Sequence, residues 1–287
     1  MKNLRLPLAA FLAPFSLGIL LHGEVARATL TLDPTFATDG IAEVDIKSGR
    51  DFARGIAVQS DGALVLAGFS QQTVGVDTIN YVTLTRLDGT TGAVDGTFGT
   101  AGIVTFLPGL TAANNGGGDA RALAIQPLDQ KIIVAGIWKA DPDASSQVFV
   151  ARLDTAGVLD PGFGTAGVEL ITPAGVTEPT VNAVALRSDG SIILVGSGTK
   201  AGDTAKPSVG IVVGLTSTGA LDPAYTSAVI DNPLTTGEQF RFNDVAILPG
   251  DGVLAAGGGG DLTLAQFTST GVPDTSFSGD GIATSTS

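Results

Sequence analysis

A nine-residue motif recurs along the chain, and this recurrence limits the fold more than any other feature. Its clearest copy, at residues 159–167, reads LDPGFGTAG. Each copy contains an aspartate, and successive aspartates are 62, 65, 62 and 52 residues apart. Spacing of this kind, repeated in order, is typical of a tandem array of similar structural units. The five aspartates are Asp33, Asp95, Asp160, Asp222 and Asp274.

Each repeat carries the same succession of short apolar runs. In the third repeat they occupy residues 168–171, 181–186, 191–196 and 209–215, and the pair Asp189-Gly190 separates the second run from the third. Asp-Gly supplies the positive φ angles that a tight hairpin turn needs. The third run is apolar throughout, which is typical of a strand covered on both faces. Its terminal glycine allows another backbone to approach closely. The pattern predicts an all-β chain of four-stranded sheets stacked like propeller blades.

The repeats predict one β-propeller-like domain over residues 29–287. A strand that follows the motif is expected at 41–46 and again at 282–287. Because the N-terminal copy already supplies such a strand, the C-terminal copy is surplus to four complete blades. We expect a ring that is closed or nearly closed, with an open β stack as the alternative. The repeats lie at about 33–94, 95–159, 160–221 and 222–273, with a partial repeat at 274–287.

The order of these motifs resembles the bacterial delta-60 repeat family. LDPGFGTAG is followed by an apolar strand ending near SDG, then by IILVG, and ARLDTAG precedes the next copy of the motif. The resemblance covers nearly all of the chain after residue 28. It implies propeller-like sheets in an exported or cell-surface protein, in a family whose functions are mostly undefined. The chain departs from the pattern at Gly214 and Gln266, which stand where earlier repeats have Arg86 and Arg152.

The first 28 residues have the layout of a secretory signal peptide. Basic residues come first, residues 6–21 are apolar, and residues 26–28 read Ala-Arg-Ala, which fits a cleavage site. A retained membrane anchor is the alternative, but a spanning helix needs about 20 residues and the apolar run is shorter. We therefore expect cleavage after Ala28, no membrane span afterwards, and a location in the periplasm, at the cell surface or outside a bacterium.

Composition excludes several classes of function. The chain has 28 acidic and 15 basic residues and a formal net charge of −13, so it lacks the basic footprint of a nucleic-acid-binding protein. It has no cysteine, and its one histidine, His22, lies in the predicted leader. Imidazole bases, thiolate nucleophiles and zinc sites built from histidine or cysteine are therefore excluded beyond the leader. We predict a protein without a cofactor and without catalysis.

The motif aspartates suggest two interpretations. Calcium sites need several oxygen ligands at short spacing, and Asp39 and Asp280 follow two of the motif aspartates closely. Ala101 and Ala166 replace this second aspartate in other repeats. Aspartate before Pro or Gly commonly accepts backbone N–H groups in turns, and we favour that interpretation, with no metal site. The aromatic residue three positions later is expected to plug the space between blades; these residues are Phe36, Phe98, Phe163, Tyr225 and Phe277.

Four polar residues share one repeat position at the start of the second apolar run. If that end of the strands opens to a channel, they line its mouth and could bind a carboxylate or a sugar. The plainer interpretation is a local surface pair between each arginine and the aspartate just before it, Asp51 or Asp119. The candidate ligand-binding residues are Arg54, Arg121, Asn182 and Asn243.

We therefore expect an exported binding or scaffold module, with an extracellular polysaccharide or a surface protein as partner. The alternative is a carbohydrate-active propeller enzyme that uses paired carboxylates, because no histidine is available. A purely structural array is the third reading. Trp138, expected to begin a loop, could stack on a sugar but is more simply a packing residue. The carboxylates available to an enzyme are Asp51, Asp119, Glu178, Glu238 and Asp244.

Overall fold

A computed structural model describes residues 31–46, 49–109, 116–203, 208–231, 233 and 239–285. In this part of the chain every regular element is a strand, so the all-β prediction is confirmed. No helix among the described residues is long and apolar enough to cross a membrane. The predicted signal peptide lies outside the described residues.

The strands of the described residues form four units, each with four antiparallel strands in chain order. The first unit holds β1 (Asp51–Val58), β2 (Leu64–Val74), β3 (Asp77–Leu87) and β4 (Ile103–Phe106). The second holds β5 (Gly117–Ile125), β6 (Ile132–Lys139), β7 (Gln147–Leu153) and β8 (Val168–Ile171). The third holds β9 (Val176–Leu186), β10 (Ile192–Lys200), β11 (Ser208–Leu215) and β12 (Ala228–Asp231). The fourth holds β13 (Arg241–Ile247), β14 (Val253–Gly258), β15 (Leu262–Phe267) and β16 (Ile282–Thr284).

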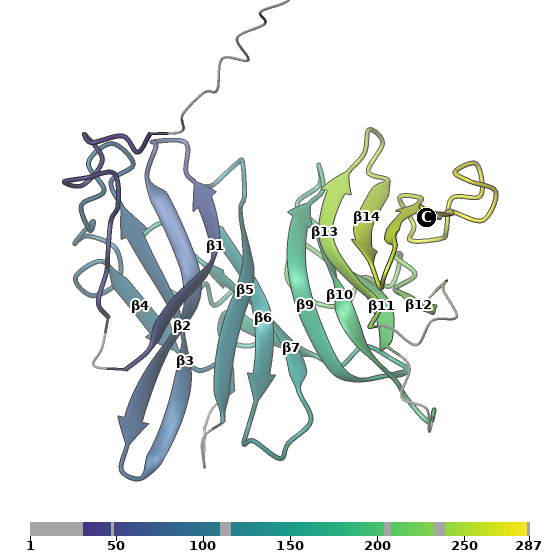
Figure 1. Cartoon of the computed structure of the whole chain (residues 1–287), viewed down its shortest axis with the longest axis horizontal. Coiled ribbons are helices and arrows are strands. Elements are labelled where there is room, and N and C mark those ends of the chain that lie inside the picture. Colours follow the sequence, from purple (N-terminus) through teal and green to yellow (C-terminus); the bar gives the residue numbers. More distant parts are fainter. Residues whose placement is uncertain are drawn as a thin grey trace, which may run out of the picture.

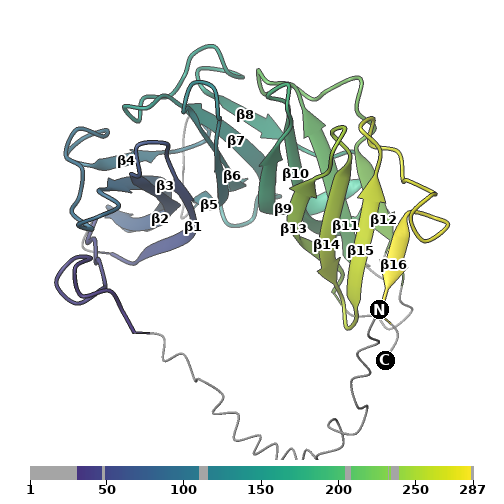
Figure 2. The same ribbon diagram turned by 90° about the horizontal axis from the view of Figure 1, so that it is seen from above.

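The four units follow one another around an arc (Figure 2). The first strands of the units, β1, β5, β9 and β13, lie next to one another along its inner side (Figures 1 and 2). A parallel pairing of Asn80 with Gly117 joins the first two units into one eight-stranded sheet, and no sheet of the described residues closes on itself. The arc is open between the first and fourth units, so the described part of the chain is not a closed ring (Figure 2).

The units are offset by one strand from the sequence repeats. The outermost strand of each unit follows the next copy of the motif, as when β4 pairs with β3 and β8 pairs with β7. The C-terminal strand β16 is therefore not surplus, because it pairs with β15 and completes the fourth unit. This corrects the expectation drawn from counting strands within a repeat.

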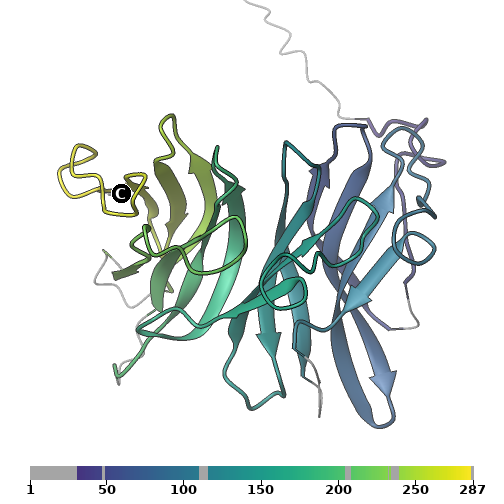
Figure 3. The ribbon, with the colours of Figure 1, turned by 180° about the vertical axis from the view of Figure 1, so that it is seen from behind.

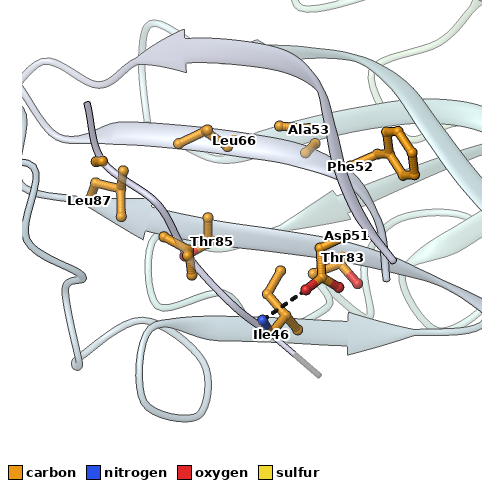
Figure 4. Close-up of a pocket in the computed structure, with 12 residues that line it drawn as sticks. Ile46, Asp51, Phe52, Ala53, Leu66, Thr83, Thr85 and Leu87 are labelled. Carbon is orange, nitrogen blue, oxygen red and sulfur yellow. Dashed lines mark hydrogen bonds between the residues drawn. The ribbon is translucent and has the colours of Figure 1, made fainter. Parts of the chain in front are cut away.

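The strand expected at 41–46 does not form. A strand at this place would pair with the third strand of a preceding unit, and the described residues hold no such strand. The segment instead crosses the face of the first unit that points away from the second unit (Figure 4). Ala42, Val44 and Ile46 line a cavity there with residues of that face, and the Ile46 N–H donates to Asp51 Oδ2 at 3.0 Å.

Two regions that follow the third apolar run are partly strand. The region 69–80 is a hairpin in which β2 runs to Val74 and β3 begins at Asp77. Trp138 belongs to β6 and is buried, with its ring against Gly109, rather than exposed in a loop. The packing role therefore holds for Trp138, and it offers no stacking surface to a ligand.

The hydrophobic core lies between the units. We call the side of a unit toward the next one its outgoing face and the opposite side its incoming face. In the first three units, four equivalent positions on the outgoing face are buried, and their apolar side chains are at most 2% exposed. These residues are Val65, Ala67, Val82 and Leu84; Ile133, Ala135, Val148 and Val150; and Ile193, Val195, Gly210 and Val212. On the incoming face of the second and third units, Ile132, Val134, Ile192 and Leu194 are buried as well, so in these two repeats the third apolar run is covered on both sides, as predicted. In the fourth repeat, Leu254 and Ala256 of this run are only half-buried.

The motif aspartates act in turns, as predicted. Asp95 Oδ1 accepts the Thr97 N–H at 3.0 Å, and Asp160 Oδ1 accepts the Gly162 N–H at 2.9 Å. Such bonds hold the backbone in a tight turn. Among the described residues, no group of three carboxylate, histidine or cysteine side chains is placed to hold a metal ion.

The third strand of the first two units carries an arginine that reaches across the boundary. The Arg152 guanidinium lies 4.9 Å from the ring centre of Phe163, and its Nε donates to Asp160 at 2.8 Å. Its Nη1 donates to the Ser217 carbonyl in the third unit at 2.7 Å. Arg86 makes the equivalent contacts one unit earlier. Each arginine thus holds an aromatic plug, its own turn and the next unit together.

Candidate binding site on the inner strands

The four predicted residues share one structural position, a β-bulge in the innermost strand of each unit. Ala53 pairs with Gly68 and Gly55 pairs with Ala67, so the residue between them on β1 opposes no partner. The register shifts at the same place on β5, β9 and β13. A bulge turns a side chain out of the regular alternation of a strand and is frequent beside functional sites. The bulged residues are Arg54, Arg121, Asn182 and Asn243.

The glycine that ends the third apolar run makes this bulge possible. A Cβ on Gly136 would collide with the Asp119 carbonyl oxygen, and one on Gly196 would collide with that of Thr180. Backbone oxygens in a sheet cannot move aside without breaking the ladder. The close backbone approach predicted for this glycine is therefore confirmed, and its reason is the bulge on the neighbouring strand.

The structure brings Arg54 and Arg121 together on one carboxylate. Arg54 Nε lies 2.7 Å from Asp119 Oδ1, and Arg121 Nε lies 3.2 Å from Asp119 Oδ2. The Asp119 side chain is 12% exposed, whereas the two arginine side chains are 43% and 29% exposed. Two cations on one anion leave a local excess of positive charge in a chain whose formal net charge is −13.

Aromatic rings continue this cluster on the first unit. The rings of Phe52 and Phe69 stack with centroids 5.0 Å apart. The Arg50 and Arg54 guanidinium groups lie 5.4 and 5.5 Å from the centres of the Phe52 and Phe69 rings, respectively. Phe52 is 42% exposed. Sequence reasoning missed both rings, although alternation of Arg50, Phe52 and Arg54 in RDFARG indicates that they share one side of a strand.

We call this group the β1–β5 cluster; it comprises Arg50, Phe52, Arg54, Phe69, Asp119 and Arg121. The two asparagines do not join it. Asn182 Nδ2 donates to the Phe242 carbonyl of the fourth unit at 2.7 Å, a contact that ties neighbouring inner strands. Asn243 is exposed and lines an open groove with Arg241 and Asp261 at the far end of the arc. The predicted site is therefore one row of equivalent positions with different local chemistry.

The carboxylates considered for catalysis have local partners. Asp119 is paired with the two arginines, and Asp244 accepts the Val245 N–H at 2.9 Å. A hydrogen bond from Lys139 lowers the pKa of Glu178 below its ordinary value, against the opposing effect of burial. Asp51 holds the Ile46 N–H. The fifth candidate, Glu238, lies outside the described residues.

Comparison with known proteins supports a propeller-like repeat. A family model described as "Domain of unknown function (DUF5122) beta-propeller" matches residues 129–163, a span that holds β6, β7 and the turn at Asp160. No curated protein matches the chain in sequence.

Two solved structures share weak overall similarity with the chain. One is a crystal structure of a protein of unknown function from Dyadobacter fermentans, with 13% identity and a TM-score of 0.41. The other is Drosophila Semaphorin 1b, extracellular domains 1-2, with 10% identity and a TM-score of 0.36. Each match covers 75% of this chain, and the matched regions span 60% and 39% of those chains, respectively.

Proposed function

We propose that this protein is an exported, four-bladed propeller-like member of the delta-60 repeat family that binds an extracellular ligand without catalysis. The order of the sequence motifs, the four units around an arc and the family match to the second unit support this proposal. In this reading each unit is one blade, and the bulged inner strands present the binding residues.

The β1–β5 cluster carries the binding part of the proposal. Guanidinium groups recognise carboxylates through paired, charge-assisted hydrogen bonds. An aromatic ring beside them offers an apolar face against which a sugar ring packs. Arg54 and Arg121 share a single carboxylate, and Phe52 is partly exposed next to them. The chemistry fits a sugar that carries a carboxylate, so an acidic extracellular polysaccharide is the proposed ligand class.

A carbohydrate hydrolase is the alternative, and it requires a carboxylic acid that keeps its proton near neutral pH. Lys139 stabilises the charged form of Glu178, and two arginines hold Asp119. The lowered pKa of Glu178 favours its ionised form, which cannot act as the acid. We therefore favour a binding function over hydrolysis.

The test compares an acidic with a neutral polysaccharide by isothermal titration calorimetry. We expect residues 29–287 to bind polygalacturonate and not dextran. Arg54→Gln and Arg121→Gln should each weaken binding about tenfold, as expected for loss of a charged hydrogen bond. Lys200→Gln is the matched control, because Lys200 pairs with Asp231 in the third unit and lies outside the cluster.

Unchanged affinity in both arginine variants would reject the cluster as the site, provided that their circular dichroism matches the wild type. Absence of polygalacturonate binding by the wild type would reject the ligand class. Export is tested separately by fractionating the producing cells and sequencing the N-terminus of the protein. We expect it outside the cytoplasm and beginning at Thr29.

A further inference from the structure

Among the described residues, nothing covers the outgoing face of the fourth unit as the other three outgoing faces are covered. The pair Ala67 and Leu84 faces the second unit and is at most 2% exposed. The equivalent pair in the fourth unit, Ala256 and Leu264, is only half-buried. Leu262 on the same face is 61% exposed. Apolar residues at positions that are buried everywhere else indicate a docking surface.

Each boundary between units also contains a plug and a socket. The plug is the aromatic ring of the motif, and the socket is a turn glycine in the next unit. Phe98 lies against Gly157 in this way, and Phe163 lies against Gly219. The N–H of the residue after the plug donates to a carbonyl of the socket turn, as Gly164 does to Thr218 at 2.9 Å. The interior plugs Phe98, Phe163 and Tyr225 are buried.

The first socket is filled by the chain's own N-terminal motif. Phe36 lies against Gly92, and the Ala37 N–H donates to the Thr91 carbonyl at 2.8 Å, as at the interior boundaries. Residues 41–46 then cross the incoming face of the first unit. We call residues 33–46 the cap. It takes the place that a preceding unit would occupy.

The cap fits less closely than a unit does. A cavity of about 150 Å³ lies between the cap and the first unit, with Leu66 and Thr85 in its wall (Figure 4). Phe36 is half-buried, in contrast to the interior plugs. A void removes dispersion contacts from its lining, so the cap is held more weakly than a packed sheet.

The fifth plug has no socket in the described residues. Phe277 is half-buried at the end of the fourth unit, and Ser278 follows it in the position of Gly164. Gln266 stands on the same face where Arg152 reaches the following unit. The described residues, the cap included, thus hold five plugs and four sockets, and the unused plug Phe277 adjoins the uncovered face of the fourth unit.

We propose that the outgoing face of the fourth unit, with Phe277 as its plug, docks the first unit of a second copy of this chain, and that the cap blocks this contact until it leaves. The occupant follows from the three interior boundaries, where the same face and plug always meet the incoming face and socket of a repeat unit. Such a contact is head-to-tail, so copies add in one direction along the arc. The proposal is independent of the ligand of the β1–β5 cluster.

The test uses analytical ultracentrifugation of residues 29–287 and substitutions that open the cap. We expect the wild type to be monomeric and Phe36→Asp to associate, because the charge expels the plug from its socket. Phe36→Asp combined with Phe277→Asp should be monomeric again. Non-specific aggregation of a damaged first unit would not be reversed by a substitution at the opposite end of the arc.

A mixing experiment assigns direction to the contact. The double variant can only accept a neighbour, and the wild type can only donate its fourth unit, so an equimolar mixture should contain a one-to-one complex. The double variant mixed with Phe277→Asp should contain none. Val44→Asp opens the cap at a second place and should reproduce the behaviour of Phe36→Asp, including its reversal.

Two results would overturn the proposal. One is that Phe36→Asp and Val44→Asp both remain monomeric while their circular dichroism shows a folded sheet protein. The other is association that persists after Phe277→Asp is added.

Discussion

Strands β10 and β14 have the same place in their units and different surroundings. On β10, Ile193 and Val195 point to the fourth unit and are at most 1% exposed. On β14, Leu254 and Ala256 occupy the equivalent positions and are half-buried. Both strands have two paired neighbours, and each carries a glycine opposite the bulge of the innermost strand. The difference therefore comes from the next unit, which covers β10, whereas the described part of the chain places no further unit beside β14.

This comparison shows that the chain is stabilised mainly by apolar contacts between neighbouring units rather than by contacts within one unit. A four-stranded sheet has two faces, and an interior unit buries both against its neighbours. The first unit has a cap of extended chain on one face, and the fourth unit has no cover on its outgoing face among the described residues. Equivalent substitutions should therefore have unequal effects along the arc.

The largest contrast is expected for the aromatic plugs. Phe163→Ala should lower the free energy of unfolding by about 3–5 kcal/mol, because its ring is fully buried between the second and third units. Phe277→Ala, the matched terminal substitution, should cost below about 1 kcal/mol. Urea denaturation followed by circular dichroism measures both. Equal losses would contradict the distinction between interior and end.

Aliphatic residues on the outgoing faces provide the next contrast. Ile193→Ala should destabilise the protein by about 2–4 kcal/mol, since it leaves a cavity between two sheets. Leu254→Ala removes a side chain that is only partly covered and should cost about 1 kcal/mol or less. Thermal unfolding by calorimetry compares the pair. A larger loss for Leu254→Ala would mean that another surface covers the fourth unit in solution.

The boundary arginines give a smaller effect. Arg152→Ala removes hydrogen bonds to Asp160 and to the Ser217 carbonyl and a contact with the Phe163 ring, which together contribute about 1–3 kcal/mol. Gln266→Ala at the end of the arc removes one hydrogen bond to Asp274 and should cost about 0.5 kcal/mol. Urea denaturation of both variants tests the ranking, which would be refuted by a greater loss for Gln266→Ala.

The last prediction concerns the pH dependence of unfolding, to which the charge of the Asp160 carboxylate contributes. A hydrogen bond from Lys131, with one from the Gly162 N–H, lowers the pKa of Asp160 to about 2. Because the folded-state pKa is below the unfolded value, this stabilisation is present above about pH 4 and is lost as the pH falls toward 2. Asp160→Asn should flatten the pH dependence of unfolding in that window. An unchanged slope would show that Asp160 is not a source of acid sensitivity.

Local features of the fold could be predicted from the sequence, and non-local ones could not. The motif spacing and the apolar runs predict the repeats, and Asp-Gly pairs mark hairpin turns. The offset between repeat and unit depends on which strand accepts the outermost partner, and no local pattern reports that choice. The fate of residues 41–46 shows the same limit, because an apolar alternation fits a paired strand and an unpaired cap equally well.

The arginine at the third boundary illustrates a compensation between distant residues. Gly214 replaces the boundary arginine there, and the Tyr225 ring packs directly over it. Arg187, from a different turn, lies 4.6 Å from the centre of the Tyr225 ring and donates to the Ser269 carbonyl of the fourth unit at 2.7 Å. The sequence shows the loss at Gly214, but only the fold shows what replaces it.

The sequence predicted where the four candidate residues lie in the fold, but it did not predict which side chain pairs with Arg54. Repeat register identified one residue on each inner strand, and all four lie at bulges. The expected pairing of Arg54 with nearby Asp51 is wrong, because Arg54 reaches Asp119 on the neighbouring strand β5. Contacts across units depend on how the sheets stack, which spacing along the chain does not determine.

Native-state hydrogen exchange tests the central claim most directly, because it reports the stability of each unit within the intact chain. We predict that the amides of β6 and β10, whose sheets are covered on both faces, exchange most slowly. Those of β14 should exchange measurably faster, although β14 is also a central strand of its sheet. Equal protection of β10 and β14, or greater protection of β14, would contradict the claim that each sheet is stabilised by burial against its neighbours.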